Sequence, residues 1–381
     1  MSQITRFKFC NALKTLSIAS IVTVAAIAQS AIPTVKVGII LPISGNTAAF
    51  GKDTLSGVKI AVEEINKKKE MKIELVVEDD KSTTTDAANA AKKLVNVDKV
   101  NVIIGSVASS NTNAAAPIAQ QAKIPLMTPA STNVNVTKAG EYVSRICFID
   151  DFQGMAMAKF AFNDLKTKKA AIITDSAQDY SIGLANAFKE TFVKLGGQIV
   201  VEVSYQSKDQ DFSSQLTKVK VKKPDILFVP GYYQEVGNMI RQAKQFGISA
   251  KFLGGDGWSG QELFDLGGEA IVGHYFSSHF SDEDTDPKVQ EFVKKYNASQ
   301  KVAPNDMAAL GYDSIYVVAD AVRRNGMKTD AAGMMKAIND TKGFAGVTGV
   351  ITLDKERNAS KPLVILETQR NRAGFKQRVN P

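Results

Sequence analysis

The chain has 381 residues, of which 44% are hydrophobic and 23% are charged, as expected of a globular protein. Lys and Arg number 47 against 39 Asp and Glu, which gives a formal net charge of +8. The basic residues are spread along the chain without interleaved aromatic residues, so this charge does not indicate nucleic-acid binding. A chain of this length exceeds what one hydrophobic core usually organises, and it therefore predicts two domains.

Residues 1–30 have the layout of a secretory signal peptide. Arg6, Lys8 and Lys14 precede an uncharged apolar run that extends from Leu16 to Ala28. The run is shorter than the roughly 20 residues that a membrane span needs, so an uncleaved anchor is the less favoured alternative. Small residues at its end predict cleavage near residues 28–31 and a periplasmic mature chain.

The two cysteines do not support a lipid anchor or an internal disulfide. Cys10 lies before the apolar run, whereas the cysteine of a lipoprotein follows such a run. Cleavage would remove Cys10 and three of the 47 basic residues. It would leave Cys147 without a disulfide partner and the mature chain with a net charge of about +5.

Short apolar runs rich in Val and Ile alternate with longer segments of helical periodicity, which predicts an α/β fold. The predicted strands are residues 35–41, 73–77, 102–105, 124–127, 170–173, 199–201, 225–229, 251–253 and 273–280. The alternation restarts at Asp150 with a helix to about Lys166, and a β-rich end covers residues 348–353 and 363–367. Buried runs separated by helices predict parallel sheets with helices on both faces.

In open parallel sheets, ligands bind beyond the carboxyl ends of the strands, where helix N-termini present unpaired N–H groups. Hydroxyl groups at 106–110 and at Ser131 and Thr132 lie at such ends and are suited to hold a carboxylate. Simple helix capping explains them equally well. Asp256, within a glycine-rich turn, is suited to hold a cation, or it is a turn aspartate that bonds its own backbone.

Signals of an enzyme are weak. His274 and His279 are the only histidines, and their spacing on a predicted strand places them on opposite faces as structural residues. No cluster of Cys and His predicts a metal site, and no cofactor is expected. Gly255 to Gly260 matches a dinucleotide-binding pattern, but Asp256 inside it would repel a pyrophosphate. The sequence therefore predicts a binding protein rather than an enzyme.

Several motifs, in this order, make the chain from about residue 35 to residue 366 resemble the substrate-binding proteins of ABC importers for branched-chain amino acids. The matching segments are Val37–Gly45, Phe50–Gly51, Ser56–Gly57, Glu78–Asp80, Gly105–Ser110, Thr128–Thr132, Tyr180–Gly183, Asp211–Ser213, Gly231–Tyr233 and Leu253–Gly257. These proteins have the type I periplasmic binding protein fold.

The resemblance implies two lobes, each a parallel sheet flanked by helices, joined by a hinge of three crossing strands. The N-terminal lobe would comprise residues 34–147 and 279–348. The C-terminal lobe would comprise residues 148–278 and 349–381.

The resemblance also assigns roles at the cleft between the lobes. Ser109 and Thr132 would hold the carboxylate of an amino acid through hydroxyl and backbone N–H groups. Ala130 would offer its carbonyl to the ammonium group. Tyr232 and Asp256 would close on the ammonium group from the other lobe.

Further residues are expected to shape the cleft. Phe50 and Tyr180 would line it. Asp256 stands where leucine-type members often have glutamate, Ser131 adds a hydroxyl where alanine is familiar, and Trp258 brings bulk near the pocket. These departures imply a preference for an aromatic, polar or smaller amino acid.

The resemblance implies a monomeric extracytoplasmic receptor of an ABC importer that closes around one amino acid, branched-chain or related, and delivers it to the membrane permease. Three alternatives remain at this stage: a ligand-sensing regulator of the same fold, a binder of an amide, urea or an aromatic acid, and a secreted hydrolase. The hydrolase is the least supported, because no nucleophile–base pair is evident.

Overall fold

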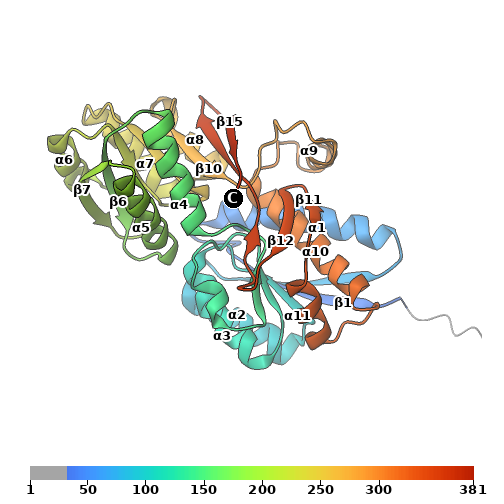
Figure 1. Cartoon of the computed structure of the whole chain (residues 1–381). Helices are drawn as coiled ribbons and strands as arrows, with labels where there is room; N and C mark the ends of the chain where they lie inside the picture. Colours follow the sequence, from blue (N-terminus) through green and yellow to red (C-terminus); the bar gives the residue numbers. More distant parts are fainter. Residues whose placement is uncertain (1–31) are drawn as a thin grey trace, which may run out of the picture. The chain divides into compact units, whose positions relative to one another are not determined.

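The computed structural model describes residues 32–381, and the predicted signal peptide lies outside this part of the chain. The described residues form two α/β lobes, each built on one large sheet (Figure 1). No helix in residues 32–381 combines the length and the apolar character that crossing a membrane requires.

The N-lobe is built on a five-stranded sheet with the order β2-β1-β3-β4-β5, in which every pair is parallel. Its strands are β1 (Thr34–Leu41), β2 (Lys72–Asp79), β3 (Val102–Gly105), β4 (Leu126–Thr128) and β5 (Val143–Arg145). The helices that pack with this sheet or with one another are α1 (Ala48–Lys67), α2 (Thr84–Lys93), α3 (Ser109–Ala122), α9 (Pro287–Gln300), α10 (Asp306–Arg324) and α11 (Ala331–Asn339).

The C-lobe is built on a seven-stranded sheet with the order β15-β14-β10-β9-β8-β6-β7. Its strands are β6 (Lys169–Asp175), β7 (Gln198–Tyr205), β8 (Ile226–Phe228), β9 (Lys251–Gly254), β10 (Tyr275–Ser278), β14 (Leu363–Thr368) and β15 (Ala373–Val379). Its helices are α4 (Asp150–Lys159), α5 (Asp179–Lys194), α6 (Ser213–Lys222), α7 (Tyr233–Gln245) and α8 (Gln261–Gly267).

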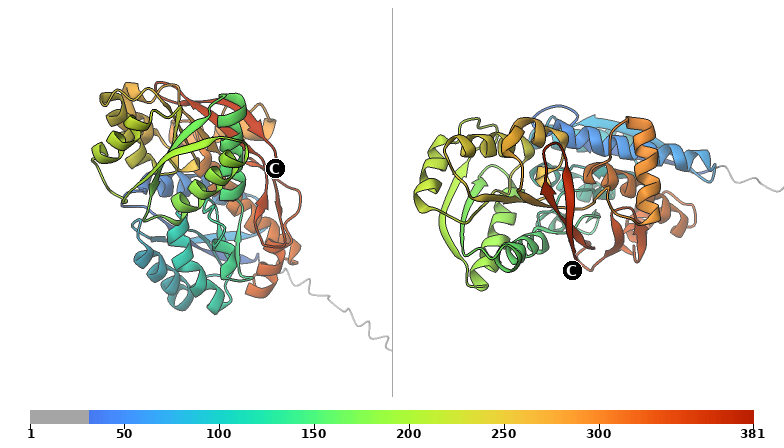
Figure 2. Two further views of the ribbon diagram at one scale, coloured as in Figure 1. Left: turned by 60° about the vertical axis from the view of Figure 1, so that its left-hand side comes forward. Right: turned by 90° about the horizontal axis from the view of Figure 1, so that it is seen from above.

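A small antiparallel sheet follows α11 in the chain. It is formed by β11 (Phe344–Gly346), β12 (Gly349–Leu353) and β13 (Ala359–Ser360). Figure 2 shows β14 and β15, in red, beside the C-lobe after this detour of the chain. The division of the chain at residues 148, 279 and 349, with its three-strand hinge, remains a prediction.

Strand β1 shows why the N-lobe needs helices on both faces of its sheet. Val37 and Ile39 point into the cluster that contains α1 and α10, whereas Ile40 points into the cluster formed with α2 and α3. All three side chains are fully buried. Successive side chains of a strand alternate between faces, so an uninterrupted apolar run fits only a sheet that is covered on both sides.

The alternating α/β pattern is confirmed, and the differences between prediction and structure lie mainly in the edge strands of the sheets. Strands β5, β11, β13 and β15 were not predicted. Strand β15 contains Lys376 and Arg378 and is largely exposed, so it lacks an apolar period, and its antiparallel pairing with β14 defines it. The helix predicted from Asp150 to Lys166 ends at Lys159 and continues as one wider turn. The two histidines flank β10 rather than lying within it.

Helices α1 and α10 cross at unusually close range, and glycine makes this approach possible. A Cβ atom at Gly57 would lie 1.9 Å from the carbonyl oxygen of Ala308, and one at Gly311 would lie 2.2 Å from that of Thr54. Both distances are well inside van der Waals contact, so neither position accepts a side chain without moving a backbone. The crossing fixes the two helices whose first turns carry Phe50 and Met307.

We expect Gly311→Ala to destabilise the protein by about 1–3 kcal/mol, because the added methyl group forces the two helices apart. Urea unfolding followed by circular dichroism measures this change. Lys59→Ala, on the exposed face of α1, is the control and should change stability by less than about 0.5 kcal/mol. Equal unfolding midpoints for the wild type and Gly311→Ala would contradict the close crossing.

Candidate functional site

A small cavity, with a volume of about 10 Å³, lies where the loops that follow the strands of the two lobes meet. Its walls are formed by Phe50, Val107, Ser109, Ala130 and Met307 of the N-lobe and by Tyr180, Tyr232, Asp256 and Gly257 of the C-lobe. Six of the eight residues predicted for the site are therefore brought together. Ser131 and Thr132 are not among the lining residues.

The N-lobe side of the cavity contains the beginning of helix α3. Ser109 is the first residue of this helix, and its Oγ accepts a hydrogen bond from the N–H of Asn133 at 3.2 Å. The first N–H groups of a helix have no partner within the helix, and the helix dipole favours an anion there. This wall is therefore suited to a carboxylate, as the strand-end pattern indicated.

Ser131 and Thr132 occupy the loop behind this wall. The Ser131 hydroxyl lies 2.7 Å from that of Thr112 and 3.0 Å from the carbonyl oxygen of Ser106, so it holds the loop together and does not face the cavity. Thr132 is 1% exposed, and its hydroxyl has no hydrogen-bond partner in the described part of the chain.

Arg145 supports this loop and was not predicted. It is fully buried, and its guanidinium donates to the carbonyl oxygens of Ser131 at 2.7 Å and Asn133 at 2.8 Å. The sequence does carry a signal, since a lone arginine interrupts the apolar segment that becomes β5 and continues beyond it. A buried arginine needs acceptors, and the loop carbonyls supply them.

Three aromatic rings form much of the remaining wall. Tyr180 and Tyr232 are stacked with their ring centres 5.4 Å apart, and Phe50 meets Tyr232 edge-on at 5.7 Å. Burial raises the pKa values of both tyrosines well above the usual value, so their hydroxyl groups remain neutral. The Tyr180 hydroxyl accepts a hydrogen bond from the N–H of Gly257 at 3.0 Å, which fixes the turn that carries Asp256.

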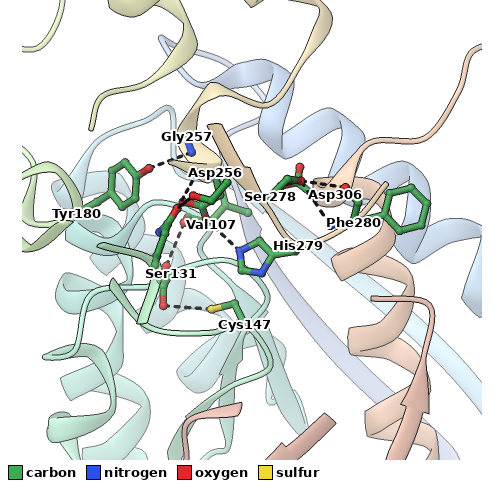
Figure 3. Close-up of polar contacts among 12 residues, drawn as sticks. Val107, Ser131, Cys147, Tyr180, Asp256, Gly257, Ser278, His279, Phe280 and Asp306 are labelled. Carbon is green, nitrogen blue, oxygen red and sulfur yellow. Dashed lines mark hydrogen bonds and ion pairs between the residues drawn. The ribbon is translucent and has the colours of Figure 1, made fainter. Parts of the chain in front are cut away.

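Asp256 is the charged group of the cavity wall, and it is only 2% exposed. Its backbone N–H donates to Gln153 Oε1 at 2.8 Å, and its Oδ2 lies 3.0 Å from His279 Nε2 (Figure 3). Its Oδ1 is buried and has no partner among the described residues. Such an oxygen is a ready acceptor for a positively charged group of a ligand.

Two neighbouring residues need comment. His279 is buried, as the structural interpretation allows, and it contacts the Asp256 carboxylate directly. Trp258, expected to bring bulk near the pocket, is fully buried and does not line the cavity, and its Nε1 donates to the Val229 carbonyl at 2.9 Å. Residues 32–381 contain no group of three or more His, Cys, Asp or Glu side chains placed to hold a metal ion.

The lobes touch on both sides of the cavity. On one side, Asn46 Nδ2 donates to Glu235 Oε1 at 2.7 Å. On the other, the N–H of Asp179 donates to Ser110 Oγ at 3.0 Å, and its carbonyl accepts from Asn133 Nδ2 at 2.7 Å. The lobes are therefore closed over the cavity, and a solute of amino-acid size can enter only if they separate.

We expect Tyr180→Phe to lower stability by about 1–3 kcal/mol, because it leaves the buried Gly257 N–H without an acceptor. Tyr205→Phe is the matched control, since the equally buried Tyr205 hydroxyl has no partner within residues 32–381. Its removal should be neutral or slightly stabilising. Thermal unfolding of the two variants tests this difference, and equal losses would show that the Tyr180 hydrogen bond contributes nothing.

Comparison with known proteins agrees with this fold. Residues 34–373 match the family described as periplasmic binding protein. The Leu/Ile/Val-binding protein homolog 3 of Brucella melitensis biotype 1 is 30% identical over 357 residues, which cover 92% of this chain and 95% of that protein. The crystal structure of the leucine binding protein LivK from Thermotoga maritima MSB8 is 40% identical, with a TM-score of 0.87, and the match covers 91% of this chain and 99% of that chain. LivJ from Streptococcus pneumoniae in complex with isoleucine is 34% identical with a TM-score of 0.86, over 91% of this chain and 100% of that chain. The chain thus belongs to the periplasmic binding protein family and has its two-lobed α/β fold.

Proposed function

We propose that this chain is the solute-binding component of an ABC importer and that it binds an α-amino acid in the cavity between its lobes. The observation that carries this proposal is the unpaired Oδ1 of the buried Asp256, which belongs to a cavity whose other wall contains a helix N-terminus. An α-amino acid matches the two walls, because its ammonium and carboxylate groups are attached to the same carbon atom.

The carboxylate of the amino acid would lie at the beginning of α3, where the Ser109 hydroxyl and backbone N–H groups can donate to it. Thr132, also predicted to hold the carboxylate, does not line the cavity, and its hydroxyl would have to turn toward the cavity to do so. Asp256 would accept from the ammonium group, with the Ala130 carbonyl and the Tyr232 hydroxyl as further acceptors. Each hydrogen bond to a charged group contributes roughly 1.5–3 kcal/mol, so a few of them suffice for tight binding.

The side chain of the ligand would pack against the apolar part of the wall, formed by Phe50, Val107 and Met307. This favours an aliphatic amino acid, and the relatives described above are named for leucine, isoleucine and valine. The expectation of an aromatic, polar or smaller ligand depended on Asp256, Ser131 and Trp258, and of these only Asp256 lines the cavity.

The wider role follows from membership in the family. The chain would be exported by its signal peptide, act in the periplasm as a monomer, and present the closed, loaded form to the permease subunits of the importer. Binding alone meets this role, since closure of the lobes is a hinge motion that requires no covalent chemistry.

We expect the mature chain to be stabilised by leucine, isoleucine or valine and not by amides, urea or aromatic acids. Bound ligand raises the melting temperature by mass action, and isothermal titration then gives the affinity. Stabilisation by aromatic acids alone, or by no amino acid, would contradict the proposed ligand class.

We expect Asp256→Asn to weaken amino-acid binding by at least about 10-fold, because the isosteric amide keeps the shape of the side chain but removes its charge. Asp265→Asn, on the exposed surface of α8, is the matched control and should bind as the wild type does. Unchanged affinity in the Asp256 variant would show that the ammonium group binds elsewhere.

A further inference from the structure

His279 is held rigidly beside the ligand cavity. It follows β10 in the chain, its side chain is 0% exposed, and its ring stacks on Phe148 with the ring centres 3.7 Å apart and the planes inclined by 22°. Stacking over a full face leaves the ring little freedom to rotate. The Nε2 atom is thereby fixed 3.0 Å from Asp256 Oδ2 (Figure 3).

The chemistry of the pair assigns the hydrogen between them. An ionised carboxylate only accepts hydrogen bonds, so Nε2 must carry the hydrogen whether the ring is neutral or charged. Oδ2 is therefore occupied, while Oδ1 of the same carboxylate stays without a partner in the described structure.

A second buried acid, Asp150, lies near Asp256, and burial of two carboxyl groups in one region increases the need for hydrogen-bond donors. Asp150 is buried at the beginning of α4, and burial, together with the charge of Asp256 to a lesser extent, raises the pKa of Asp150 well above its usual value. A charged carboxylate in such surroundings is stable only if donors or cations hold it. Within the protein, the His279 ring supplies a side-chain donor to Asp256.

We propose that His279 is a positioning residue that makes the site selective for an ammonium group: it holds the Asp256 carboxylate turned so that Oδ1 is available to the ligand. This inference rests on the proposed function. It adds that the preference for amino acids over otherwise identical acids without an ammonium group depends on a histidine that does not contact the ligand.

The test compares two ligands that differ only in this group: L-leucine and L-leucic acid, in which a hydroxyl group replaces the ammonium group. The selectivity is the Kd for L-leucic acid divided by the Kd for L-leucine, measured by isothermal titration. If another amino acid binds the wild type more tightly, that amino acid and its 2-hydroxy analogue are used. We expect His279→Leu to lower the selectivity by at least about 10-fold, mainly through weaker amino-acid binding.

Two further variants separate positioning from packing. The side-chain amide of His279→Gln can place an N–H near the position of Nε2, whereas that of His279→Asn is too short, so we expect the first to retain the selectivity and the second to lose it. If His279→Leu does not fold, the comparison of His279→Gln with His279→Asn still tests whether the donor at this position sets the selectivity.

His274→Leu is the matched control. His274 flanks the other end of β10, and burial lowers its pKa to about 4. It accepts from the N–H of Phe252 at 3.2 Å and does not line the cavity, so its loss should affect stability but not selectivity. Equal selectivity in the wild type and all three His279 variants would overturn the inference while leaving amino-acid binding intact. A wild type that binds no amino acid would instead overturn the proposed function, and this inference with it.

Discussion

Burying the carboxylate of Asp256 is the constraint on which the arrangement of the site depends. Removing an ion from water costs several kcal/mol even in a relaxed protein, so its oxygens need donors or a cation. One oxygen of Asp256 has the His279 ring, and the other has no partner among residues 32–381. The surrounding bonds keep the turn from moving this oxygen back to solvent, since Gln153 holds the N–H of Asp256 and Tyr180 holds that of Gly257.

Rigid support of this kind extends into the N-lobe. The Arg145 guanidinium fixes the loop after β4 through two carbonyl oxygens, and the Ser131 hydroxyl bonds inside the same loop. The close crossing at Gly57 and Gly311 fixes the helices that contribute Phe50 and Met307. Each wall of the cavity is therefore held within its own lobe, and the motion that opens or closes the cavity is a movement of one lobe relative to the other.

Apolar periodicity in the sequence predicted most of the strands and helices. The ends of the predicted strands indicated which loops carry the site. Parallel strands place their carboxyl ends at one edge, so Ser109 and Ala130, which follow strands of one sheet, could be assigned to a common region before any contact was known. The resemblance placed Asp256, which follows a strand of the other sheet, opposite them. Contacts set by side-chain direction could not be predicted. Trp258 is two residues from Asp256 and points away from the cavity, whereas His279 is 23 residues away and touches the same carboxylate.

Strand β15 was missed for a related reason. Its sequence is too polar to show a strand period, and its pairing with β14 is a property of the folded sheet. Resemblance to a family supplied the eight site residues but not the supporting group, because the short motifs contain the residues near the ligand and omit Arg145 and His279.

The separation of charges between the lobes links recognition to closure. The wall suited to a carboxylate belongs to the N-lobe, and Asp256, suited to an ammonium group, belongs to the C-lobe. A ligand that carries only one of these groups forms charged hydrogen bonds with one lobe, and it does not stabilise the closed form through the other lobe. A ligand shifts the equilibrium between open and closed forms only by its difference in affinity for the two. An amino acid has a large difference, because both of its charged groups are bonded only when the lobes meet. If the proposed function holds, the buried oxygen of Asp256 would make closure conditional on a zwitterion, and the closed form would distinguish loaded from empty protein.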